Sequence, residues 1–133
     1  MEELFKDMER ENQLSLHAVG EGIYGVDAEG RGTFANPAAE RMLGWRIDEL
    51  MGRVLHRVVH HSHADGSLYP LKDCPIYAAF RDASVKRVGE DWVWRKDGSG
   101  FPVEYTSTPI LDNGHPVGAV VVFRDISARQ EAQ

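Results

Sequence analysis

The alternation of apolar and polar positions over residues 22–45 predicts a β-hairpin followed by a helix. Strand-forming residues precede and follow a turn at 27–30, where Asp and Gly favour a tight reversal of the chain. Asn36 is a suitable helix N-cap, Pro37 fits the first helical position and Gly44 ends the helix. This stretch therefore predicts a strand–turn–strand–helix unit of an α+β protein.

Residues 1–19 predict another helix in front of this unit, because they are rich in Glu, Lys, Arg, Leu and Met and contain one seam with helical spacing. Asn12 lies on that seam, at the kind of position where a buried polar residue sets the register of a coiled coil. The helix could pair with a second copy of the chain or pack on its own domain, and both alternatives stay open.

The middle of the chain predicts short helices. Helical turns are expected over residues 45–50 and 51–61, and the Gly- and Pro-containing stretch 62–72 is expected to be a loop. A longer helix is expected over 74–83, with Asp73 as its N-cap.

The last third of the chain predicts strands over residues 85–95, 101–111 and 117–124, joined by turns that contain Gly. The third strand is almost entirely apolar, which predicts a central position in the sheet. Asp125 is then expected to begin a final helix.

Length and charge narrow the classes of function. A chain of 133 residues is expected to form one domain, and its net charge of −6 without a basic block argues against a nucleic-acid partner. No apolar run approaches the roughly 20 residues that span a bilayer, and the charged N-terminus does not resemble a signal peptide. The single cysteine, Cys74, excludes an internal disulfide and predicts a reducing compartment, so we expect a cytoplasmic protein.

Four stretches together resemble the PAS sensory domain family over about residues 14–127. They are AVGEGIYGVDAEGRGTFANPAAERMLGW, the turn DELMGR, the strand pair WRKDGSGFPVEYTSTPI and the closing strand GAVVVFRDIS. The resemblance implies a five-stranded antiparallel sheet with short helices over one face and flanking N- and C-terminal helices. It implies three parts: an N-terminal helix over 1–19, a PAS domain over 20–127 and the start of a C-terminal signalling helix over 128–133.

PAS domains hold ligands between the sheet and the helices, so the resemblance indicates where a ligand would bind. The apolar and aromatic candidates for such a pocket are Phe34, Met42, Leu55, Ile76, Phe80, Trp92, Trp94, Val103 and Tyr105. The FRDIS segment resembles the family's closing motif, which implies a signal junction at Asp125, Ile126 and Ser127.

A cluster of histidines and the cysteine is the second candidate site. His56, His60, His63 and Cys74 are residue types that bind zinc or similar metals, although their spacing matches no standard zinc signature. Some PAS domains bind haem through a histidine above the pocket, which makes His56 or His60 a candidate ligand for haem. Flavin is not expected, because the light-sensing PAS domains have their reactive cysteine just after a Gly-Arg pair, and Gly52-Arg53 is followed by Val54-Leu55-His56.

The resemblance implies a sensor or dimerisation module of a bacterial signal-transduction protein, such as a two-component system. It would bind a small ligand or partner and relay a conformational change to an output domain, a histidine kinase or a cyclic-dinucleotide enzyme. The alternatives are a ligand-free dimerisation module and a haem or metal sensor that uses the His56–Cys74 cluster. The expected partners are a second copy of the chain, as a homodimer through the N-terminal helix, and the output domain. Catalysis by this chain is not expected, because it contains no nucleophile elbow, phosphate loop or kinase histidine motif.

Overall fold

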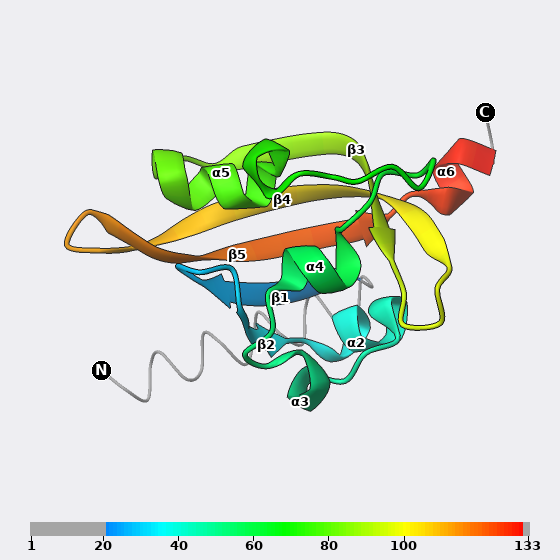
Figure 1. Cartoon of the computed structure of the whole chain (residues 1–133), viewed down its shortest axis with the longest axis horizontal. Coiled ribbons are helices and arrows are strands. Elements are labelled where there is room, and N and C mark those ends of the chain that lie inside the picture. Colours follow the sequence, from blue (N-terminus) through cyan, green and yellow to red (C-terminus); the bar gives the residue numbers. More distant parts are fainter. Residues whose placement is uncertain (1–20, 132–133) are drawn as a thin grey trace.

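The computed structural model describes residues 21–131, and in this part of the chain five strands form one antiparallel sheet. The strands are β1 (Gly22–Asp27), β2 (Gly32–Ala35), β3 (Lys86–Trp94), β4 (Gly100–Asp112) and β5 (His115–Asp125). Their order across the sheet is β2-β1-β5-β4-β3, so the last strand of the chain lies in the centre (Figure 1). The five-stranded α+β fold and the central position of the apolar strand are both confirmed.

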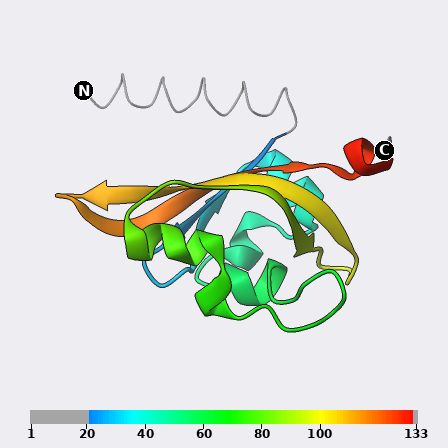
Figure 2. The same cartoon turned by 90° about the horizontal axis from the view of Figure 1, so that it is seen from above.

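The helices are short and most of them connect β2 to β3. They are α2 (Pro37–Leu43), α3 (Ile47–Leu50), α4 (Leu55–Val59) and α5 (Pro75–Asp82), with a 3₁₀ turn, η1 (Leu71–Asp73), before α5. The helices α4 and α5 lie over one face of the sheet, where α5 packs on β3, β4 and β5 (Figure 2). The last helix, α6 (Ser127–Glu131), follows β5 beyond the edge of the sheet.

The core lies between this face of the sheet and the helices. Alternate residues of β4 point into it, because successive side chains of a strand face opposite sides. The buried set on β4 is Phe101, Val103, Tyr105 and Ser107, as the sequence pattern predicts. From the opposite side, the fully buried Leu43, Leu50, Leu55 and Val59 of α2, α3 and α4 complete the core.

Asn36 connects the hairpin to α2. Its side-chain oxygen accepts hydrogen bonds from the N–H groups of Ala39 and Ile23, each 2.9 Å long. Gly44 ends the helix with a φ of 75°, a left-handed conformation that glycine adopts at little cost. The predicted cap and stop of α2 are therefore confirmed.

Two expectations about the middle of the chain are wrong in detail. The helix expected over 51–61 is only α4, because Gly52 has a φ of 78° and Val54 forms a β-bridge with Arg31, which delays the helix. The N-cap of α5 is Cys74 and not Asp73, because Asp73 already belongs to the 3₁₀ turn.

The helix predicted over residues 1–19 and the end of the C-terminal helix at 132–133 lie outside the described residues, so these domain boundaries stay predictions. Within residues 21–131, no helix is both long and apolar enough to cross a membrane.

Candidate functional site

A small cavity lies between the sheet and the helices that cover it. Tyr24 and Val26 of β1 form its base, and residues of α4 and α5 form its walls. The space open to a water-sized sphere is about 20 Å³, which is enough for roughly one water molecule. Three side chains of the types that bind metals also line it: His56, His60 and Cys74.

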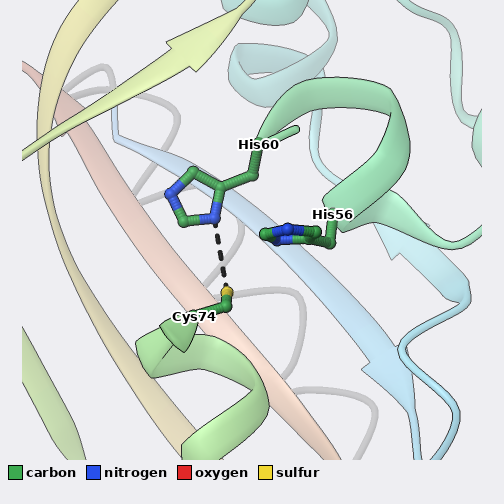
Figure 3. A group of neighbouring side chains, drawn as sticks. All are labelled: His56, His60 and Cys74. Carbon is green, nitrogen blue, oxygen red and sulfur yellow. Dashed lines mark hydrogen bonds between the residues drawn. The ribbon is translucent and has the colours of Figure 1, made fainter. Parts of the chain in front are cut away.

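His60, directly after α4, is the most buried of the histidines, with 1% of its surface exposed. Its Nε2 lies 2.9 Å from Oδ2 of Asp91, and its Nδ1 lies 3.3 Å from Sγ of Cys74. Both ring nitrogens therefore have partners: Asp91 on β3 and Cys74 directly before α5. Figure 3 shows the contact with Cys74.

His56 lies one helical turn before His60, so both side chains reach the same side of α4. Its Nε2 lies 2.7 Å from the carbonyl oxygen of Tyr69. Its Nδ1 is buried and has no hydrogen-bond partner among the residues that the structure describes. One ligand atom from each of His56, His60 and Cys74 can be chosen so that all lie within 4.8 Å of one another (Figure 3).

Asp91 holds this cluster from the side of the sheet, and sequence reasoning missed it. Its Oδ2 accepts hydrogen bonds from the hydroxyls of Tyr105 at 2.9 Å and Tyr69 at 3.2 Å, in addition to its contact with His60. Its Oδ1 accepts the N–H of Trp92 at 2.8 Å. Its position in the strand could have predicted its orientation. Asp91 precedes the buried Val93 by two residues, so both side chains face the core.

Hydrogen bonds outweigh burial in the electrostatics of this cluster. Burial alone lowers the pKa of His60, but its bonds to Asp91 and Cys74 raise it to about 9. Burial alone raises the pKa of the Cys74 thiol, but the nearby imidazoles of His56 and His60 lower it to about 6. For Asp91, burial also raises the pKa, and the stronger effect of His60 holds it below the ordinary range. A thiolate–imidazolium pair beside a carboxylate is the favoured charge state near neutral pH.

The predicted pocket residues fall into two groups. Leu55, Ile76 and Phe80 line the cavity, whereas Val103 and Tyr105 belong to the core cluster without lining the cavity. Met42, Phe34, Trp92 and Trp94 do not line the cavity either.

Phe34 and Trp94, which do not line the cavity, make contacts elsewhere. Phe34 is 39% exposed and packs over Gly25, whose register in β1 faces the sheet side opposite the cavity. Trp94 donates a hydrogen bond to the carbonyl of Ser62 at 2.9 Å and stacks on His61. His63 stacks on Tyr69, with 4.2 Å between ring centroids, and lies outside the group of three.

The predicted signal junction lies where β5 passes into α6. Oδ1 of Asp125 accepts the N–H of Ser127 at 2.8 Å and its hydroxyl at 2.6 Å. Between them, Ile126 is buried and donates its N–H to the carbonyl of Pro102 on β4 at 3.0 Å. The junction is thus built into the sheet at the end of its central strand.

Two contacts that the sequence did not predict attach α6 to neighbouring strands. Arg129 binds both carboxylate oxygens of Glu104 on β4, each at 3.1 Å. Gln130 donates a hydrogen bond of 2.7 Å to Glu90 on β3. The start of α6 therefore contacts two strands as well as the one that leads into it.

Relatives with known names contain this domain within much longer chains. The probable diguanylate cyclase DgcE of Escherichia coli is 34% identical over 128 residues, which cover 95% of this chain and 11% of the relative. The histidine kinase AtoS of Escherichia coli is 26% identical over 124 residues, which cover 92% of this chain and 19% of the relative. The chain spans between about a tenth and a fifth of such relatives.

Solved structures show the same fold. A PAS domain from Colwellia psychrerythraea matches with a TM-score of 0.70 and 21% identity, covering 92% of this chain and 99% of the other. The PAS domain of nitrogen regulation protein NR(II) from Vibrio parahaemolyticus matches with a TM-score of 0.65 and 18% identity, covering 86% and 97%. A family model described as the PAS fold matches residues 10–126. The chain belongs to the PAS family and is a domain of the kind found in signal-transduction proteins.

Proposed function

We propose that this domain senses a signal at the cavity between sheet and helices and relays it through β5 to α6. The observation that supports the relay is continuity. Val121 and Phe123 of β5 belong to the core cluster, together with the cavity residues Tyr24 and Phe80, and β5 ends at the Asp125 cap of α6. A change at the cavity thus has a short path through packed side chains to the outgoing helix.

The mechanism is a shift between two arrangements of the helices over the sheet. A ligand or partner that favours one arrangement changes the populations by its difference in affinity for the two. A cavity of about 20 Å³ is far smaller than the roughly 300–1,000 Å³ of pockets for drug-sized molecules, so a larger ligand, including haem, would require α4 or α5 to move.

The output that we propose is an enzyme in the same polypeptide, in a reducing compartment such as the cytoplasm. The named relatives include a probable diguanylate cyclase and a histidine kinase, and the domain covers a small share of each. These names support a cyclic-dinucleotide enzyme or a histidine kinase as the output domain.

The relay can be tested with Asp125→Ala in the full-length parent protein. We expect the variant to fold and to lose most of its response to the signal, because the cap that joins β5 to α6 is removed. Asp65→Ala is a matched control: Asp65 makes the same two bonds to Ser67, at 2.9 and 2.6 Å, in the loop between α4 and η1. A normal response in the Asp125 variant would contradict the relay.

A second proposal is dimerisation through the helix predicted over residues 1–19. Asn12 supports it, because it lies on the seam of that predicted helix at the kind of position where a buried polar residue sets coiled-coil register. Sedimentation should give a dimer for the whole chain and a monomer after deletion of residues 1–19. A whole chain that sediments as a monomer at all accessible concentrations would count against it.

A further inference from the structure

We propose that His56, His60 and Cys74 form a binding site for a thiophilic transition-metal ion of the zinc class. The three residues come from two helices: the histidines from α4 and its end, the cysteine from the position directly before α5. Two imidazoles and one thiolate are a ligand set that zinc and similar ions prefer.

Both histidines make, through one ring nitrogen, the type of hydrogen bond that metal-bound histidines commonly make. A metal-bound histidine commonly donates its second ring N–H to a carboxylate or a backbone carbonyl, which fixes the tautomer and the ring orientation. His60 has the carboxylate, Asp91, and His56 has the carbonyl, that of Tyr69, both at Nε2. Release of the proton that His60 Nδ1 shares with Cys74 Sγ would leave both Nδ1 atoms with lone pairs for an ion.

His56 provides the observation that a simple hydrogen-bonded cluster does not explain. Its Nδ1 is buried and lacks a hydrogen-bond partner within residues 21–131. A buried polar atom without a partner costs about 1–3 kcal/mol, so such atoms are rare without a reason. Coordination of an ion would satisfy this nitrogen.

The distances are close to those of a tetrahedral centre. With metal–nitrogen bonds of about 2.0–2.1 Å and a metal–sulfur bond of about 2.3 Å, tetrahedral ligand atoms lie roughly 3.3–3.6 Å apart. Nδ1 of His60 and Sγ of Cys74 are 3.3 Å apart, and one ligand atom of each of the three residues can be chosen so that all lie within 4.8 Å of one another. Rotation of the side chains about their single bonds would bring the ligand atoms to these distances.

The adjoining cavity leaves a fourth position. Its free space of about 20 Å³ fits one water molecule or one small exogenous ligand. Three protein ligands with one open position are typical of zinc sites that exchange ligands, whereas structural zinc sites have four protein ligands.

Bound metal would connect α4 to α5 directly over the sheet. The ion would thereby hold the two helices whose relative movement we propose as the start of the relay. This regulatory role rests on the proposed function, whereas metal binding itself depends only on the three side chains and their neighbours.

The test is a titration of the reduced, chelator-treated chain with Co²⁺, a spectroscopic substitute for Zn²⁺. We expect one ion per chain, a thiolate-to-cobalt charge-transfer band and intense visible bands of a tetrahedral ion, all abolished when Zn²⁺ displaces the cobalt. Absence of the charge-transfer band in the folded wild-type protein would overturn the proposal, whatever the variants do.

Substitution of each residue tests whether it binds the metal ion. Cys74→Ser should remove the charge-transfer band, and His56→Ala or His60→Ala should weaken binding by more than about 100-fold, since loss of an outer partner alone costs 10–100-fold. Asp91→Asn tests that outer partner and should weaken binding by about 10–100-fold while the charge-transfer band remains.

Two control variants should bind as the wild type does. His63→Ala alters a histidine in the loop after α4 that lies outside the group of three, and His115→Ala alters an exposed histidine at the start of β5. Equal loss of binding in a control and in the His56 variant would overturn the assignment. If metal binds with the expected spectrum but Asp125→Ala leaves signalling intact, the metal site stands and the proposed relay fails. If the charge-transfer band is absent but Asp125→Ala abolishes the response, the relay stands and the metal site fails.

Discussion

Asp27 stabilises the turn between β1 and β2 through its charged side chain. Its Oδ1 accepts the N–H groups of Glu29 and Arg31, each at 2.9 Å, and its Oδ2 binds Nε of Arg31 at 3.0 Å. Partial burial raises the pKa of Asp27, but these bonds outweigh it and hold the pKa below the ordinary 3.8.

This lowered pKa predicts a pH dependence of stability. The carboxylate stabilises the fold fully above pH 3.8, and its contribution is lost as the pH falls through the lower pKa of the folded state. Asp27→Asn keeps the oxygen acceptor but not the charge, so the variant should be less stable at neutral pH, and the difference should shrink in acid. Urea unfolding at several pH values measures this, with Asp112→Asn on the exposed β4–β5 hairpin as control. A difference that stays constant down to pH 2, roughly two units below the ordinary pKa, would contradict it.

Gly118 shows how closely β1 and β5 approach. A Cβ added at Gly118 would lie 2.2 Å from the carbonyl oxygen of Val26, a backbone atom with little freedom to move. Gly118→Ala should therefore destabilise the domain by about 1–3 kcal/mol. Gly89→Ala is the control, since nothing lies within 4 Å of its added Cβ and its effect should stay within about 0.5 kcal/mol. Equal midpoints of denaturation for the two variants would show this account to be wrong.

At the same scale, sequence reasoning grouped His56, His60, His63 and Cys74, but it neither separated His63 from the other three nor showed how those three are joined. Their separation along the chain gave no reason to combine them with Asp91, which is 31 residues from His60. A register shift in β3 between Val88 and Asp91 also interrupts the regular alternation of inward and outward side chains just before Asp91. Side-chain partners set by such a bulge depend on the tertiary fold.

Among the elements, α6 depends on its contacts with the sheet, because a helix of five residues has little stability of its own. Glu104→Gln should weaken the paired bonds from Arg129 and speed hydrogen exchange of the α6 amides by a few-fold. Amides of β4 should exchange as in the wild type. Glu29→Gln in the β1–β2 turn is the control, and the idea would be contradicted if it altered α6 as much.

The elements themselves were largely predictable where a local signal exists. Asn36, Pro37 and Gly44 fixed α2 because caps and stops act within one helical turn. The shortened α4 was not predictable, because its start depends on the bridge between Val54 and Arg31, a contact with a distant strand end.

In the whole molecule, one core joins sheet and helices, so unfolding should be a single cooperative transition. Leu43→Ala, at a site only 1% exposed, should cost about 2–5 kcal/mol and shift the denaturation midpoint without changing the slope. Leu111→Ala, 50% exposed near the end of β4, should change stability by less than about 0.5 kcal/mol. Tryptophan fluorescence and far-ultraviolet circular dichroism should give coincident curves; separate transitions would contradict a single core.

The fold class followed from the order of the elements, since each strand pair and helix had its own periodicity. The lining of the cavity did not follow from this order, because it combines residues from β1, α4 and α5 whose side chains meet only after packing.

The central position of β5 also determines when the protein can fold. β3, β4 and β5 form a local antiparallel meander, but β1 pairs only with β2 and with β5, and Gly22 lies opposite Phe123, about 100 residues later. On a ribosome that adds about 5–20 residues per second, β5 is therefore synthesised roughly 5–20 s after the β1–β2 hairpin. The earliest strands to be synthesised are among the last to be joined to the sheet, so assembly must finish after translation of the domain.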